Sequence, residues 1–129
     1  MKIFLSLFLL LFLFSGKQDD PLASSMKRGQ EIYQDFCINC HMQEGEGVPG
    51  AFPPLAGADF LLNNREASIH AVKYGQKGEI VVNGETYNNI MTPLYLADEE
   101  VVDVMNFILN SWGNKGEMVT LEEVEAVEE

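Results

Sequence analysis

The chain has 129 residues, in which 20 Asp and Glu stand against 8 Lys and Arg, for a net charge of −12. An acidic surface argues against nucleic acid as a partner, because phosphate binding needs a basic one. The length allows one small domain after an N-terminal segment of a different character.

Residues 1–16 have the pattern of an export segment. Met1-Lys2 is a short basic start, and the run from Ile3 to Phe14 is apolar apart from Ser6. This pattern predicts a secretory signal peptide, and the run is shorter than the about 20 residues that span a bilayer. No A-x-A cleavage sequence follows it, so an uncleaved N-terminal anchor is the alternative. Either way we expect an exported, periplasmic protein, soluble or membrane-tethered.

The next segments predict a linker, a helix and a long loop. Residues 17–25 are polar and are interpreted as a linker, in which Ser24 or Ser25 caps a helix over 26–36. Glycines and prolines are dense over 43–59, which predicts a loop.

Further along, a short helix is expected over 67–74, ended by Gly75, and Asn83-Gly84 is a hairpin-type turn signal. A longer helix is expected over 98–111, with acidic residues in its first turn, where the helix dipole favours them.

The C-terminal end of the predicted domain, which covers 26–115, is followed by an acidic tail, 116–129. Thr120-Leu121-Glu122-Glu123 is a capping box that predicts a short terminal helix, whereas the density of acids predicts a tail that is largely solvated or frayed. Helices joined by long loops make a poor core for so small a domain, and a large apolar cofactor would explain how they become ordered.

Both cysteines of the chain lie in the stretch CINCH, as Cys37 and Cys40, followed directly by His41. A structural zinc site has four ligands, and beyond the three in this stretch only His70 or a carboxylate could supply the fourth. A thioredoxin-like dithiol follows a strand in a βαβ pattern, but the residues before Cys37 read as helix. A structural disulfide here closes too small a loop to constrain much chain.

The fourth interpretation is covalent haem, because C-x-x-C-H is the attachment sequence of c-type haem. At this spacing on a helical turn, each sulfur can form a thioether with one vinyl group of the porphyrin, and the next residue turns its imidazole to the iron. The interpretation therefore makes Cys37 and Cys40 the attachment points and His41 an iron ligand.

An electron carrier needs an iron ligand on the other face as well. Met91 is the best candidate, because it lies in a non-helical run before Pro93, far enough along the chain to wrap round a haem. His70 is better explained as an exposed or capping histidine. The remaining methionines after the export segment follow His41 directly, fit helix stripes or lie in the tail: Met42, Met26, Met105 and Met118.

These features resemble a class I cytochrome c of the bacterial monohaem kind. In that family a glycine and an aromatic precede the haem cysteines, here Gly29 and Tyr33, and an aromatic of the last helix, here Phe107, packs near the glycine. Pro53-Pro54-Leu55-Ala56-Gly57 matches the family's P-x-L-x-G element, and Met91-Thr92-Pro93 matches its Met-x-Pro segment.

The resemblance implies an all-α cytochrome c fold, with helices and long loops wrapped round one covalent haem c and its iron. It implies a hydrogen bond from His41 to the carbonyl of Pro53, which fixes the imidazole tautomer. The usual Ser or Thr cap of the last helix is replaced by Ala97, so Asp98 or the helix dipole is expected to compensate. The expected pocket lining is Phe52, Leu55, Ile90, Leu94 and Ile108.

The predicted function is one-electron transfer in a respiratory or dehydrogenase-linked chain, without enzyme activity. The alternative is a haem enzyme or sensor that binds a small ligand at the iron, against which Met91 argues because it closes the site. The expected partners are redox proteins that donate and accept the electron, with a basic docking surface that complements the acidic chain.

Overall fold

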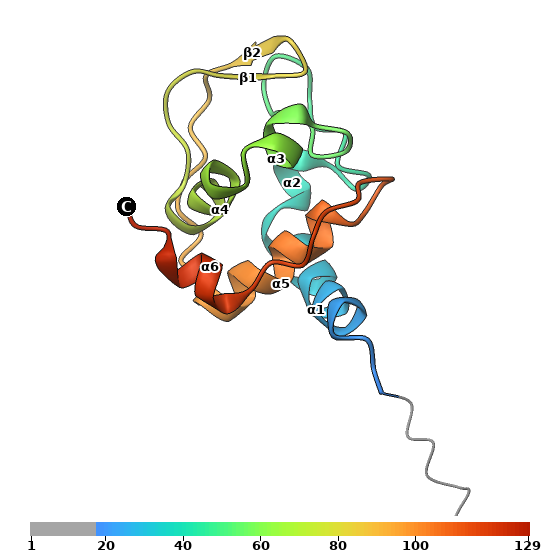
Figure 1. Ribbon diagram of the computed structural model, residues 1–129. Helices are drawn as coiled ribbons and strands as arrows, with labels where there is room; N and C mark the ends of the chain where they lie inside the picture. The colour runs from blue at the N-terminus through green and yellow to red at the C-terminus, as the bar shows by residue number, and fades with distance from the viewer. Residues whose placement is uncertain (1–17) are drawn as a thin grey trace, which may run out of the picture.

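The computed structural model describes residues 18–129, so the predicted export segment, 1–16, lies outside the described residues. The chain forms helices joined by long loops, and a small hairpin lies at the end opposite α1 (Figure 1). No helix within the described part of the chain is long and apolar enough to span a membrane. The elements are α1 Pro21–Phe36, α2 Ile38–His41, α3 Asp59–Asn63, α4 Arg65–Tyr74, β1 Ile80–Val82, β2 Glu85–Tyr87, α5 Asp98–Leu109 and α6 Leu121–Ala126.

Helix α1 begins inside the segment that we predicted to be a linker. Asp20 is its N-cap and accepts a hydrogen bond from the backbone N–H of Leu22 at 3.1 Å, and Pro21 occupies the first turn. An aspartate followed by proline is a strong helix start, because the cap accepts a free N–H and proline has none to leave unpaired. The predicted cap at Ser24 or Ser25 was therefore wrong.

Helix α5 begins where the sequence predicted and ends at Leu109, two residues before the predicted end. Its N-cap is Ala97, which has no side-chain acceptor. The carboxylate of Glu100 accepts a hydrogen bond from the backbone N–H of Ala97 at 2.8 Å, which is one half of a capping box. This bond pairs the N–H of Ala97 itself and does not replace the acceptor that a Ser or Thr cap would offer to the first turn. Asp98, Glu99 and Glu100 lie in that turn, where the helix dipole favours acidic side chains.

Helices α1 and α5 cross in close contact at Gly29. A Cβ added to Gly29 would lie 1.9 Å from the carbonyl oxygen of Asp103 and 2.8 Å from Cβ of Phe107, so only glycine fits. Beside the crossing, the ring of Tyr33 lies 5.4 Å from that of Phe107 and 5.1 Å from that of Trp112. The predicted contact between Gly29 and Phe107 is confirmed.

A polar network holds the same crossing. The carboxylate of Asp103, which is buried, accepts hydrogen bonds from Ser25 Oγ at 2.6 Å and from Arg28 at 2.6 and 2.8 Å. Ser25 in turn accepts a bond from the side-chain amide of Asn106 at 2.9 Å. These bonds to Ser25 and Arg28 offset the desolvation cost of burying the carboxylate.

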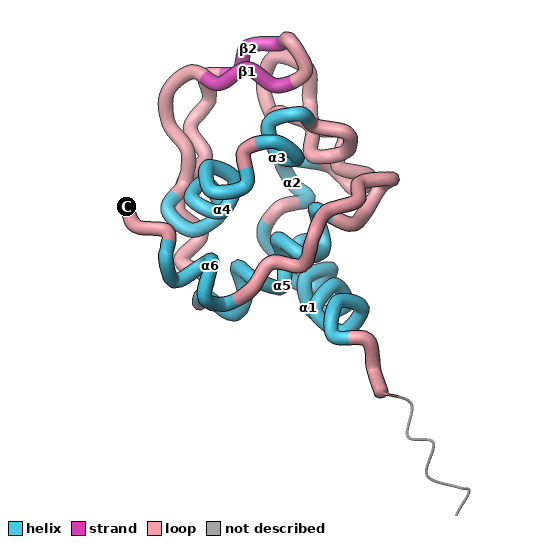
Figure 2. Tube along the Cα trace, viewed as in Figure 1, coloured by secondary structure: helices cyan, strands magenta, loops and turns pink. Residues whose placement is uncertain are grey.

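The long loops and the hairpin cover the side of the molecule away from the crossing (Figure 2). Strands β1 and β2 pair antiparallel, with Val82 opposite Glu85. Asn83 and Gly84 between them both have positive φ, 52° and 80°, as a type I′ turn requires. The predicted hairpin turn is confirmed, and α4 begins two residues before the predicted 67.

The C-terminal segment contains the short helix that its capping box predicts, α6, and it is packed against the core, contrary to the predicted solvated or frayed tail. The capping box is present, with Thr120 Oγ1 accepting from the N–H of Glu123 at 3.3 Å and Glu123 accepting from the N–H of Thr120 at 2.9 Å. Val119, Val124 and Val127 are buried in the core. The error arose because these three apolar side chains lie among glutamates that are mostly exposed.

The Gly29 contact gives a stability prediction. Gly29→Ala should lower the free energy of unfolding by about 2–3 kcal/mol, because the added methyl group forces the two helices apart. Gln30→Ala, at the exposed neighbouring position of α1, should change it by less than about 0.5 kcal/mol. Denaturant unfolding of both proteins measures the difference, and equal values would show that the crossing tolerates a side chain.

Candidate haem site

The helices and loops enclose a cavity of about 260 Å³. Residues from all five helices α1 to α5, from the hairpin and from the loops over 43–58 and 88–97 line it, and most of them are apolar. Within residues 18–129, none of the lining residues is Asp, Glu, Lys or Arg. The site is therefore a low-dielectric space suited to a large apolar group with few polar contacts.

Cys37, Cys40 and His41 lie on one helical turn that follows α1. The N–H of Cys37 donates to the carbonyl of Tyr33 at 2.9 Å, and the N–H of His41 donates to the carbonyl of Cys37 at 3.0 Å. Met42 ends the turn with φ 64°. All three predicted residues line the cavity.

The imidazole of His41 is oriented by the loop that follows it. Its Nδ1 lies 2.9 Å from the carbonyl oxygen of Pro53, which can only accept, so the proton is on Nδ1 and Nε2 keeps a free lone pair. Burial lowers the pKa of His41, and the bond to Pro53 opposes this effect only in part. A neutral imidazole with a free Nε2 is the form that ligates iron.

The cysteines do not have the properties of a redox dithiol. Cys37 and Cys40 are not joined in a disulfide. Burial, and then the proximity of Cys40, raises the pKa of Cys37 to about 12, whereas reactive dithiols have a lowered value. Within residues 18–129, no three His, Cys, Asp or Glu side chains are grouped so that they could hold a metal ion. Both observations favour the haem interpretation over the dithiol and zinc alternatives.

The loop over 43–58 is held by hydrogen bonds that its own sequence does not reveal. Asn114, which is buried just after α5, donates to the carbonyls of Leu55 at 3.0 Å and Ile108 at 2.8 Å, and accepts from the N–H of Gly57 at 2.8 Å. This single amide ties the loop to α5. We did not predict it, because nothing in the local sequence distinguishes Asn114 from a surface asparagine.

Met91 also lines the cavity, and its backbone is paired with the end of α4. The N–H of Gln76 donates to the carbonyl of Met91 at 2.9 Å, and the N–H of Met91 donates back to Gln76 at 2.8 Å. Gln76 is a second residue that we did not predict, since a contact between backbones leaves no side-chain signal.

The other candidates for an iron ligand lie elsewhere. Among the methionines at positions 18–129, Met91 is the one that lines the cavity. The ring of His70 stacks against Tyr74 with 5.2 Å between centroids, outside the cavity lining. The five expected lining residues, Phe52, Leu55, Ile90, Leu94 and Ile108, are all in the wall.

The donor set and the walls fit a covalently attached haem. Two thiols, an imidazole with a free nitrogen and a thioether, which is a soft ligand for iron, face one uncharged cavity. A model of the family described as Cytochrome c matches residues 26–112, which include every one of these groups. This chain belongs to the cytochrome c family. Its cofactor is one covalently attached haem c, and it is a monohaem electron carrier.

Similar proteins agree with this cytochrome assignment. A cytochrome c-552 of Thermus thermophilus is 44% identical over 98 residues, covering 72% of this chain and 66% of the relative. A second one is 45% identical over 91 residues, covering 67% and 69%. The cytochrome c subunit of a quinone alcohol dehydrogenase from Gluconobacter oxydans is 34% identical over 90 residues, covering 67% of this cytochrome but 18% of the relative. This chain thus spans about two thirds of the Thermus proteins and a small part of the Gluconobacter subunit.

A pair of glycine substitutions tests the packing that sets the Pro53 carbonyl. Gly47 and Gly57 have nearly equal φ values, 63° and 61°. A Cβ on Gly47 would lie 2.7 Å from the carbonyl oxygen of Pro53, whereas one on Gly57 meets nothing within 4 Å. Both alanine variants should lose about 1–2 kcal/mol of unfolding free energy to the left-handed backbone.

Gly47→Ala should lose roughly a further 1–3 kcal/mol, because its methyl group displaces Pro53. Denaturant titration of the haem-loaded proteins compares the two. Equal losses would mean that the loop yields to the added methyl group at no cost.

Proposed function

We propose that Cys37 and Cys40 attach the haem, that His41 and Met91 ligate its iron, and that this cytochrome is an exported carrier in a dehydrogenase-linked respiratory chain. One observation carries the proposal: these four side chains line the same uncharged cavity, although Met91 is far from the others in sequence. The bound haem supplies an iron that takes up and releases one electron.

The chain's own residues are suited to holding iron ligands unchanged in both oxidation states. The hydrogen bond to Pro53 fixes the ring and tautomer of His41. The paired backbones of Gln76 and Met91 hold the methionine segment at the wall of the cavity. Ligands that do not move on electron uptake keep reorganisation small, and a thioether ligand raises the reduction potential.

A haem enzyme or small-ligand sensor needs a free position at the iron. Met91 occupies that position in our proposal, so the site is closed to ligands and enzyme activity is not expected. The names of the relatives support the function of an electron carrier. Two of them are cytochromes c-552, and others are cytochrome c subunits of alcohol and gluconate dehydrogenases.

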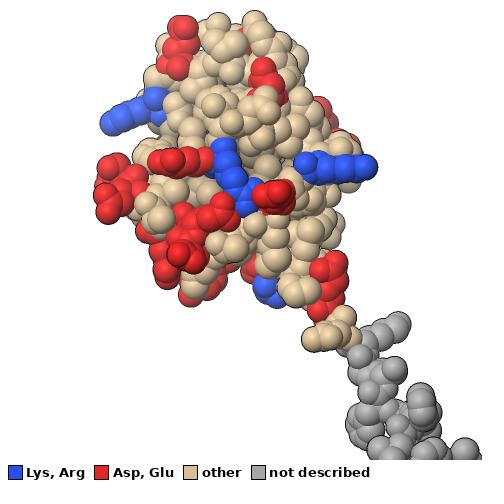
Figure 3. Space-filling model, in the orientation of Figure 1, with Lys and Arg blue, Asp and Glu red and all other residues tan. Residues whose placement is uncertain are grey.

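The partners that we propose are redox proteins with a basic docking surface, among them a dehydrogenase as electron donor. Asp and Glu gather on the face of this cytochrome around α6 and the C-terminus, where Lys and Arg are fewer (Figure 3). The export pattern of residues 1–16 supports a periplasmic location, in which the protein is either soluble or tethered to the membrane.

Substitution of Met91 tests the ligand assignment. Met91→Ala should abolish the weak near-infrared band of sulfur-ligated ferric haem, lower the reduction potential and let cyanide bind readily, because the iron loses its thioether ligand. Optical spectra and potentiometry measure these changes. Met118→Ala, at an exposed methionine, is the matched control and should leave all three properties as in the wild type. Retention of the band in Met91→Ala would mean that another residue is the ligand.

Partner choice should depend on charge and salt. Opposite charges speed the encounter of two proteins, and they are screened over about 8 Å at physiological ionic strength. Oxidation of the reduced cytochrome by a basic redox protein should therefore be fast at low salt and slow as salt is added. Stopped-flow measurements with an acidic redox protein of similar potential provide the control. Equal rates with both partners that do not change with salt concentration would show that the acidic surface plays no part in partner choice.

A further inference from the structure

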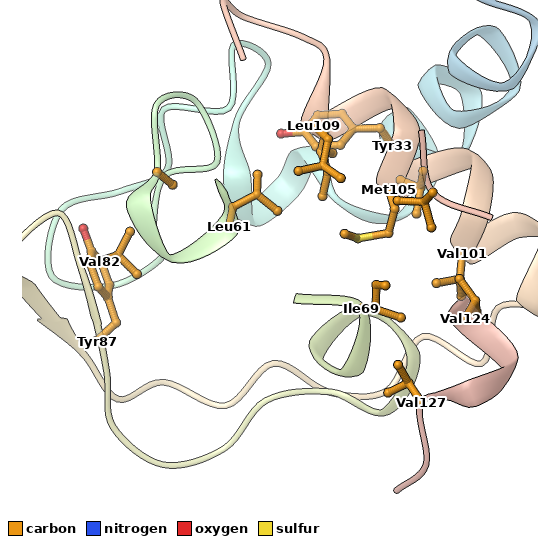
Figure 4. Close-up of a cluster of buried hydrophobic side chains, with 14 residues drawn as sticks. Tyr33, Leu61, Ile69, Val82, Tyr87, Val101, Met105, Leu109, Val124 and Val127 are labelled. Carbon is orange, nitrogen blue, oxygen red and sulfur yellow. The ribbon is translucent and has the colours of Figure 1, made fainter. Parts of the chain in front are cut away.

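The C-terminal strap, which we define as residues 117–127, is a fixed part of the structure that lies beyond the residues matched by the family model, 26–112. Val119 and Val124 are fully buried, and Val124 and Val127 lie beside Val101 and Ile69 in the core (Figure 4). The side chain of Asn106 pairs with both backbone groups of Val119, at 2.6 and 3.2 Å. The strap is therefore anchored to α5.

The strap also binds the first residue of α4. Arg65 donates hydrogen bonds to the backbone carbonyls of Glu117 at 3.0 Å and Met118 at 2.9 Å. The same guanidinium forms two bonds with the carboxylate of Glu123, at 2.7 and 3.0 Å. A planar guanidinium with several fixed donors suits this multiple contact.

At the last turn of α4, a second set of bonds joins it to the strap. Lys73 Nζ donates to the carbonyls of Val124 at 2.8 Å and Val127 at 3.2 Å, at the C-terminal end of α6. The hydroxyl of Tyr74 donates to the carbonyl of Val127 at 3.1 Å. Lys73 also lies 3.3 Å from the carboxylate of Asp98, and its side chain is only 13% exposed.

The end of α4 leads directly to Met91. Gly75 ends the helix with φ 86°, and the next residue, Gln76, makes the two backbone bonds with Met91. A Cβ on Gly75 would lie 2.5 Å from the carbonyl oxygen of Met91, so the two segments are in close contact. A shift of this end of α4 would therefore shift the Met91 backbone.

We propose that Lys73 and Tyr74 are positioning residues for Met91: the strap fixes the end of α4, and the end of α4 fixes the segment that carries the iron ligand. Neither residue lines the cavity, so both act through the Gln76–Met91 pair. The inference rests on the proposed ligation by Met91. It gives the strap a role at the iron in addition to its contribution to stability.

Ligand exchange separates these two roles. The haem-loaded full chain is compared as wild type, as a Lys73→Gln, Tyr74→Phe double variant and as an Arg65→Gln control. Arg65 binds the strap at the far end of α4, so its substitution should lower the melting temperature without loosening Met91. The measurement is the rate at which imidazole displaces Met91 in the ferric protein, followed by loss of the near-infrared band.

The double variant should bind imidazole about tenfold faster than the wild type, because the lost hydrogen bonds make local opening of the Met91 segment easier. Arg65→Gln should stay within about twofold, since its bonds do not hold this end of α4. The single variant Lys73→Arg, in which Tyr74 is unchanged, keeps a cationic donor and should bind imidazole nearly as slowly as the wild type.

Each other outcome is decisive. Equal rates in the wild type, the double variant and Arg65→Gln would overturn the inference while leaving Met91 as ligand. A wild type without the near-infrared band would overturn the ligand assignment and the inference together. If the double variant takes up no haem, Tyr74→Phe alone removes one hydrogen bond and should give about a threefold increase. An unchanged rate in that variant would equally overturn the inference.

Discussion

The close crossing of α1 and α5 at Gly29 sets the position of everything that surrounds the cavity. Because the backbone of Asp103 fits directly against Gly29, the two helices are held nearer than any side chain would allow. Helix α1 leads straight into the turn that bears Cys37, Cys40 and His41, so the crossing also fixes this turn, the proposed attachment point of the haem, relative to α5. Helix α5 in turn presents Val104 and Ile108 to the same cavity. A rigid helix pair thus supplies one side of a site whose other side consists of loops.

Those loops are ordered by hydrogen bonds to backbone groups more than by side-chain packing of their own. Asn114 connects the first loop to α5, the Pro53 carbonyl connects it to His41, and the Gln76–Met91 pair connects the second loop to α4. A loop held in this way keeps its shape while its side chains line an apolar space. This arrangement agrees with the family's need for ligands that stay in place when the iron changes oxidation state.

The strong negative charge and the haem site are kept apart in this cytochrome. Acidic side chains cover the outer face around α6, whereas the described residues that line the cavity carry no formal charge. The strap combines both properties, because its valines are buried in the core while its glutamates remain outside. Burial on one side and charge on the other let one segment stabilise α4 and contribute to the acidic surface.

The sequence by itself predicted the helical turn that bears Cys37, Cys40 and His41, the hairpin turn and the start of α5, since each depends on neighbouring residues. Cys37, Cys40 and His41 must share one helical turn, and Asn83-Gly84 favours a tight hairpin wherever it occurs. Only the tertiary structure decided that Asn114, Gln76, Lys73 and Arg65 matter, because their partners are remote in sequence or are backbone groups. The tail was mispredicted for the same reason: its charges are local and visible, whereas the core that receives Val119 and Val124 is assembled from distant helices.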